Sequence, residues 1–181
     1  MNLSQDIQEF LKYPPLQKID PTTGRPENEN LYDIVSQSVL VIFLTGLFEA
    51  TRTKENAIVI QEQKTTNGLL DKMFNYKAAV LIYIKEFTKN DENYINTKLE
   101  EVASGYLQVI QQKDYVVALQ KEKGLEDLLS NERHKILLFL PPGLKTGELF
   151  NHQTIDDNTN KMEGPVSTLM NKIGDVFSKD D

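Results

Sequence analysis

The chain has 181 residues, of which 27 are acidic and 20 are Lys or Arg, so its net charge at pH 7 is −7. This length suits one domain with a single hydrophobic core. The acidic balance argues against nucleic-acid binding, because contacts with phosphate supply most of the non-specific affinity and require a basic surface. The lack of cysteine excludes disulfides, thiolate nucleophiles and zinc–thiolate sites.

The first residues carry neither a basic stretch nor an apolar run, so the sequence shows no secretory signal. The most apolar run spans residues 39–48 and is far shorter than the roughly twenty residues that a helix needs to cross a bilayer. We therefore expect a cytoplasmic protein without a transmembrane segment.

Residues 1–30 are expected to form a short helix followed by a proline-rich linker. Ser4 is a suitable N-cap for this helix. One face of the helix contains Ile7, Phe10 and Leu11. The linker is predicted from the prolines and glycine at positions 14, 15, 21, 24 and 26. We expect residues 31–181 to form a single helical domain.

Two long helices are predicted in the first two thirds of the chain. Residues 31–52 are apolar on every side in their middle part, as in a helix that neighbours surround, and should form the centre of the fold. A second helix begins after Asn90 or Asp91, and its apolar residues recur at steps of four and three. These are Ile95, Leu99, Val102, Tyr106 and Val109. A patch of small residues at 103–105 would permit close approach of a neighbouring backbone.

The remaining segments are shorter. A helix starting within 115–120 should end at Gly124, and Ser130 should cap another helix over 131–140. Residues 57–61, 79–85 and 135–140 fit either a helix or a buried strand. Because no stretch alternates apolar and polar residues, we predict an all-α fold: a compact multi-helix bundle around the central helix. A mixed α/β fold that uses these three ambiguous segments as strands is the alternative.

The acidic loop at 152–163 is the candidate region for metal chemistry. Its potential ligands are His152, Asp156, Asp157 and Glu163. The loop matches the first ligand positions of an EF-hand, but Lys161 stands where glycine is needed and Ser167 where glutamate is needed. We therefore favour hydrogen bonding of these side chains to nearby backbone, and we predict no metal, cofactor or catalytic residue. His134, among charged neighbours, is expected to be a solvated surface side chain.

Residues 165–177 are predicted to form a C-terminal amphipathic helix, because Pro165 suits a first helical turn. Its apolar stripe consists of Val166, Leu169, Met170, Ile173 and Phe177. We expect this stripe to dock on the protein's own core, since burying it would contribute a substantial part of the stability of a domain.

The function that these features favour is a soluble, non-enzymatic helical module that binds another protein or itself. One alternative is a metal-dependent hydrolase that uses the 152–163 loop. The other is a peripheral membrane-surface protein that binds through helix 165–177, although the few basic residues on that helix weigh against this alternative.

Overall fold

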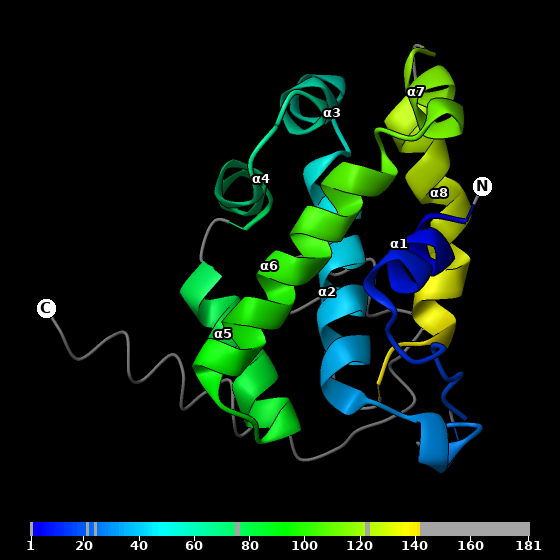
Figure 1. Ribbon diagram of the computed structural model, residues 1–181, viewed down its shortest axis with the longest axis vertical. Coiled ribbons are helices and arrows are strands. Elements are labelled where there is room, and N and C mark those ends of the chain that lie inside the picture. The colour runs from blue at the N-terminus through cyan, green and yellow to red at the C-terminus, as the bar shows by residue number, and fades with distance from the viewer. Residues whose placement is uncertain (1, 21, 24, 75–76, 122–123, 142–181) are drawn as a thin grey trace, which may run out of the picture. The chain divides into compact units, whose positions relative to one another are not determined.

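The computed structural model describes residues 2–20, 22–23, 25–74, 77–121 and 124–141, and these residues form a bundle of helices (Figure 1). Within them no strand occurs, and the only β-type pairing is an isolated bridge between Ile19 and Pro26. The predicted all-α fold is confirmed. The elements are α1 (Leu3–Leu11), the 3-10 helix η1 (Glu29–Leu31), α2 (Ile34–Ala50), α3 (Lys54–Gln61), α4 (Thr66–Met73), α5 (Lys77–Thr88), α6 (Glu92–Val109), α7 (Lys113–Leu119) and α8 (Gly124–Leu138).

Helix α2 lies at the centre of the bundle, as the sequence predicts (Figure 1). Every residue from Val35 to Leu47 is buried, because α3, α4, α5, α6 and α8 all pack against this helix. The helix begins at Ile34 because the side chain of Asp33 accepts hydrogen bonds from the backbone N–H groups of Val35 and Ser36, each at 3.1 Å. None of the described helices is long and apolar enough to span a bilayer.

Helix α6 packs against α2 on one side and α1 on another. Its N-cap is Asp91, one of the two predicted residues, which accepts from the N–H groups of Asn93 and Tyr94. The patch of small residues does allow a close approach, at Gly105. The close neighbour is the side chain of Leu11 in α1 and not a backbone: a Cβ atom added to Gly105 would lie 3.1 Å from Cγ of Leu11. Leu3 and Ile7 on α1 are fully buried, so this helix contributes to the hydrophobic core.

The three ambiguous segments adopt helix as far as the structure describes them. Residues 57–61 belong to α3, 79–85 to α5, and 135–138 to the last turn of α8. Their short apolar runs fit both a helix and a strand locally. Packing decides the outcome, because α3, α5 and α8 each cover part of the buried helix α2.

Three predicted helix ends are wrong. The N-cap of α1 is Asn2, not Ser4, whose hydroxyl is used elsewhere. Gly124 begins α8 instead of ending the preceding helix; a Cβ at this position would lie 2.7 Å from Cα of Leu119, so only glycine fits where α8 starts beside α7. Ser130 is not a cap, because α8 runs through it without a break. The sequence suggested a break here because serine is a common N-cap residue, whereas position 130 lies within one continuous helix.

Candidate functional site

The residues predicted for metal binding or for docking at the C-terminus lie outside the described residues. These are His152, Asp156, Asp157 and Glu163, and the stripe of Val166, Leu169, Met170, Ile173 and Phe177. Their roles stay predictions. His134 lies in α8, and its side chain is likewise outside the description. Within the part of the chain that the structure describes, no group of three or more His, Asp or Glu side chains could hold a metal ion.

The end of the bundle formed by α3 and α7 exposes four aliphatic side chains. Ile58 and Val59 on α3 are 50% and 37% exposed, and Val116 and Val117 on α7 are 41% and 55% exposed. Both helices lie at the upper end of the molecule in Figure 1. Gln61 joins them, because its Nε2 donates a 3.2 Å hydrogen bond to the carbonyl oxygen of Leu119. We call this surface, defined by the four aliphatic residues, the α3–α7 end.

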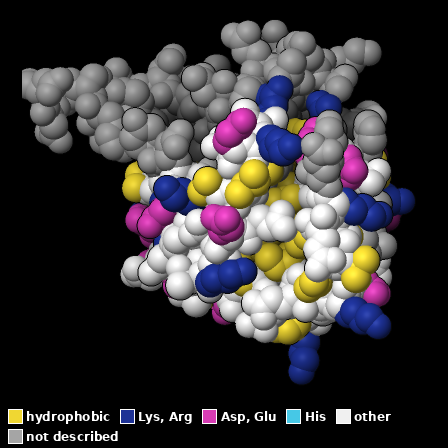
Figure 2. All heavy atoms as spheres, turned by 90° about the horizontal axis from the view of Figure 1, so that it is seen from above, with side chains coloured by type: hydrophobic (Ala, Val, Ile, Leu, Met, Phe, Trp, Pro, Cys, Tyr) yellow, Lys and Arg dark blue, Asp and Glu magenta, His cyan; other side chains and the backbone are white. Residues whose placement is uncertain are grey.

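Figure 2 shows this end from above, with hydrophobic side chains gathered along a hollow and charged side chains around it. Exposed apolar side chains that gather at one end of a protein can mark an interaction site, whereas single exposed aliphatic residues are ordinary. The α3–α7 end is therefore the best candidate functional surface among the described residues.

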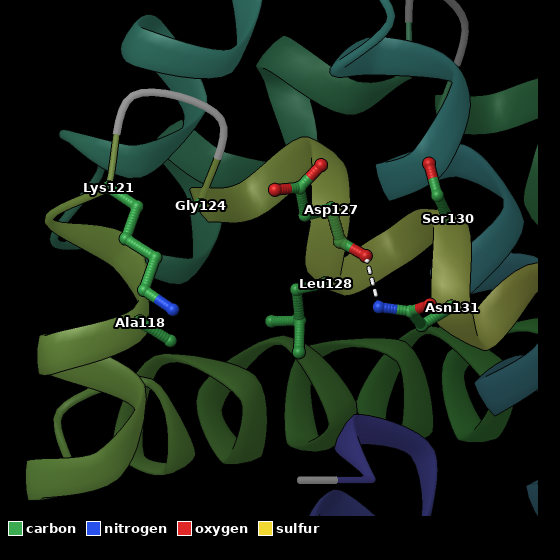
Figure 3. Close-up of a pocket in the computed structure, with 7 residues that line it drawn as sticks. All are labelled: Ala118, Lys121, Gly124, Asp127, Leu128, Ser130 and Asn131. Atoms are coloured by element: carbon green, nitrogen blue, oxygen red, sulfur yellow. Dashed lines mark hydrogen bonds between the residues drawn. The ribbon is translucent and has the colours of Figure 1, made fainter.

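A pocket of about 430 Å³ lies between α7 and α8 at the same end of the molecule. It is lined by Ala118, Lys121, Gly124, Asp127, Leu128, Ser130 and Asn131 (Figure 3). The amide of Asn131 is already engaged, since its Nδ2 donates a 2.9 Å hydrogen bond to the backbone oxygen of Asp127. No hydrogen bond joins the hydroxyl of Ser130 to a basic side chain among the residues drawn. The lining thus combines two apolar side chains, Ala118 and Leu128, with four polar or charged ones, and the residues drawn show no nucleophile hydrogen-bonded to a base.

A buried polar cluster ties α1 to α7 and α8. The Ser4 hydroxyl donates a 2.7 Å hydrogen bond to Oε2 of Glu132, which is only 1% exposed, and the backbone N–H of Ser4 donates to the same oxygen at 3.3 Å. The hydroxyl of Tyr115 donates to Asp6. Burial, and next the hydrogen bond to Asp6, raise the pKa of Tyr115 above its usual value. These bonds fix α1 against the α7–α8 pair, so a structural role accounts for the cluster.

A second polar cluster, on the outer side of α6, is also structural. Nζ of Lys98 lies 4.9 Å from the ring centre of Tyr13, 5.7 Å from that of Tyr94 and 2.8 Å from Oε2 of Glu101. The Tyr13 hydroxyl donates to Oε2 of Glu101 at 2.8 Å. Burial, followed by this hydrogen bond, raises the pKa of Tyr13, whereas the hydrogen bond from Lys98 lowers the pKa of Glu101. The cluster attaches the segment after α1 to α6 through cation–π and ionic contacts.

Replacing Ser4 by Ala is expected to lower the free energy of unfolding by about 1.5–3 kcal/mol, the usual contribution of a hydrogen bond to a charged group. The reason is that Glu132 loses its shortest hydrogen bond from Ser4 while staying buried. Urea unfolding followed by circular dichroism measures the change. Ser104→Ala, on the exposed side of α6, is the matched control and should have almost no effect. Equal losses in the two variants would show that the Ser4 hydroxyl does not stabilise the fold.

No family model matches the chain, and neither a curated protein nor a solved structure matches it. The functional argument therefore starts from the surface and chemistry of the described residues.

Sequence reasoning missed the α3–α7 end, although a signal for it was present. Ile58 and Val59 precede the buried Ile60, and Val116 and Val117 follow the buried Tyr115. A helix turns by about 100° per residue, so a short helix cannot place three successive side chains in the same core. A run of neighbouring apolar residues in a short helix, such as residues 58–60 or 115–117, therefore predicts that some apolar surface is exposed.

Proposed function

We propose that this chain is a non-enzymatic protein-binding module, and that the α3–α7 end is its docking surface. The observation that carries the proposal is the exposure of four aliphatic side chains on two neighbouring short helices. Water-exposed apolar area of this kind is unfavourable for a free protein and becomes favourable when a partner covers it.

The rest of the bundle does not need these side chains for its stability. The core is already formed by α2 and the helices around it, with Ile60 of α3 and Tyr115 of α7 buried at 2% exposure each. The outward-facing Ile58 and Val117 add little to that core. Burying a Val or Ile side chain fully contributes roughly 1.5–3 kcal/mol, so covering half-exposed ones supplies a useful part of a binding free energy.

The pocket between α7 and α8 supports the same proposal. Interfaces concentrate their binding energy in a few anchors that enter recesses near the centre of the contact. Ala118, the residue after Val117 in α7, lines this pocket together with polar residues of α8, and we propose that a side chain of the partner enters it. The hydrolase and membrane-surface alternatives rest on residues 152–163 and 165–177, which lie outside the described residues, so both stay predictions.

Substituting both Ile58 and Val117 by Asp is expected to reduce partner capture by about tenfold or more, as loss of central interface residues does. Tagged wild-type chain, the double variant and the control Leu31→Asp are compared as baits. Each bait is mixed with lysate of the source cells and with an untagged copy of the chain, and captured proteins are quantified by mass spectrometry. Leu31 is a matched control because it is 47% exposed and lies in η1, at the opposite end of the bundle.

The expected result is one or more proteins retained by the wild type and by Leu31→Asp but lost by the double variant. Circular dichroism of all three baits establishes that the helices are intact. If the wild type retains nothing, or if all three baits retain the same proteins, the α3–α7 end is not a docking surface.

A further inference from the structure

We propose that Asn67 is a site of spontaneous covalent modification, at which the backbone nitrogen of Gly68 attacks the side-chain amide of Asn67 and converts it to aspartate or isoaspartate. These two residues form the only Asn-Gly pair in the sequence. The pair lies in the first turn of α4, and Asn67 is exposed to solvent. The reaction needs no partner except water, so the local structure of α4 sets its rate.

The chemistry is an intramolecular aminolysis followed by hydrolysis. The backbone nitrogen of Gly68 loses its proton and forms a bond to Cγ of Asn67, while the bond between Cγ and Nδ2 breaks and ammonia leaves with that proton. The product is a cyclic imide. Water then opens the ring at one of its two carbonyl carbons. Opening at Cγ gives aspartate, and opening at the main-chain carbonyl gives isoaspartate. No atom is oxidised or reduced.

The side chain of Asn67 is available for this reaction. Among the described residues no hydrogen bond engages its amide. The amides of Asn90, Asn96 and Asn131, in contrast, each donate a hydrogen bond to another residue. Glycine at position 68 adds the second condition, because a residue without a Cβ leaves its backbone nitrogen uncovered and its backbone free to leave helical dihedral angles.

The N-cap of α4 controls the reaction. The backbone N–H of Gly68 donates a 3.2 Å hydrogen bond to Oγ1 of Thr65, the N-cap residue. The nitrogen must leave this hydroxyl before it attacks, and Asn67 must leave its helical conformation, because a helical backbone does not bring the next nitrogen onto Cγ. The modification therefore proceeds when the first turn of α4 frays, which helix ends do more readily than the core.

Asn93 provides a matched comparison within the same chain. It is the second residue of α6, as Asn67 is the second residue of α4, and it is also exposed. The N–H that follows it, that of Tyr94, donates a 3.2 Å hydrogen bond to the N-cap side chain of Asp91. The two sites thus share their helical position and their kind of cap. They differ in the residue that must supply the nitrogen, which is glycine only after Asn67.

The two products should have opposite effects on α4. Aspartate keeps the backbone and adds a negative charge to the first turn, where the helix dipole favours it. Isoaspartate adds a methylene group to the main chain, which displaces residue 68 from the Thr65 hydroxyl. Leu69 and Leu70 follow directly and are fully buried, in a helix that packs against α2 and α6. The isoaspartate form should therefore unfold at lower urea concentration than the unmodified chain.

The test is incubation of the purified full chain at mildly alkaline pH, with samples taken over several days. Peptide mapping by mass spectrometry measures, at each Asn, the mass increase that replacement of –NH2 by –OH brings, and chromatography separates the aspartate and isoaspartate peptides. We expect both products at Asn67 and no measurable conversion at Asn93. Conversion at Asn67 no faster than at Asn93 would overturn the proposal.

Two substitutions at the cap test the control of the rate. Thr65→Ala should raise the rate at Asn67 by about fivefold, because loss of a side-chain cap typically increases fraying by this factor. Thr65→Ser keeps the hydroxyl and should react like the wild type. Gly68 itself is left unchanged, since a Cβ there would lie 2.9 Å from Oγ1 of Thr65 and would disturb the cap. Circular dichroism checks that both variants keep their helices. Equal rates in the wild type and Thr65→Ala would show that the cap does not control the reaction.

Discussion

Replacing Phe43 by Ala is expected to lower the free energy of unfolding by about 3–5 kcal/mol, the usual cost of removing a buried aromatic ring from a core. Phe43 lies in the buried part of α2, has no exposed surface, and its ring centre is 5.6 Å from that of Tyr106 on α6. The substitution leaves a cavity at the most extensive helix contact of the bundle, between α2 and α6. Urea unfolding followed by circular dichroism measures the effect.

Phe10→Ala is the control for this prediction, because it deletes the same ring from a position that is 49% exposed on α1. The loss there should stay below about 1 kcal/mol, since little apolar surface leaves the core. A loss at Phe43 no larger than that at Phe10 would contradict the placement of the core around α2.

Replacing Gln37 by Leu, which keeps the volume of the side chain, is expected to cost about 2–4 kcal/mol, because several buried polar groups lose their partners together. Oε1 of Gln37 accepts from the backbone N–H of Gln17 at 2.9 Å, and Nε2 donates to the carbonyl oxygens of Gln17 at 2.8 Å and Phe139 at 2.7 Å. The side chain thus holds the extended segment after α1 and the residue after α8 on the same turn of α2.

Gln120→Leu is the matched control, since Gln120 is exposed at the end of α7, and its stability change should lie within about 0.5 kcal/mol. Hydrogen exchange of the Gln17 amide adds a second measurement, because this N–H loses its acceptor in the Gln37 variant. Unchanged exchange at Gln17 together with unchanged stability would show that the side chain of Gln37 does not hold the two segments.

Local sequence patterns were sufficient for the fold class and for two main helices. The steps of four and three in α6 were identifiable, as was Asp91 as its cap, because a carboxylate next to the first turn satisfies backbone N–H groups within the same segment. Burial of α2 was also predictable, since a helix that is apolar all round is stable in water only when other elements surround it.

The candidate site was not predictable in the same way. The sequence directed attention to the C-terminal forty residues, whereas the surface that carries the proposed function lies on α3 and α7. Ile58 and Val117 have the composition of core residues, and only the three-dimensional packing shows that Ile60 and Tyr115 fill the core while these two face outward. A run of neighbouring apolar residues in a short helix indicates that some of them are exposed, but which ones are exposed depends on the helices that surround the segment.

The sequence by itself determined the positions of α2 and α6, the burial of α2 and the absence of cysteine chemistry. The helix period and the cap of α6 are set by neighbouring residues, and the cysteine count is read directly from the composition. The tertiary structure decided the roles of residues that break those patterns. Glu132 lies within a helix that the sequence predicted, but its charge gave no reason to expect burial; it is buried because it accepts a hydrogen bond from Ser4, 128 positions earlier in the chain. A contact over such a separation depends on the packing of α1 against α8, and no window of local sequence encodes it.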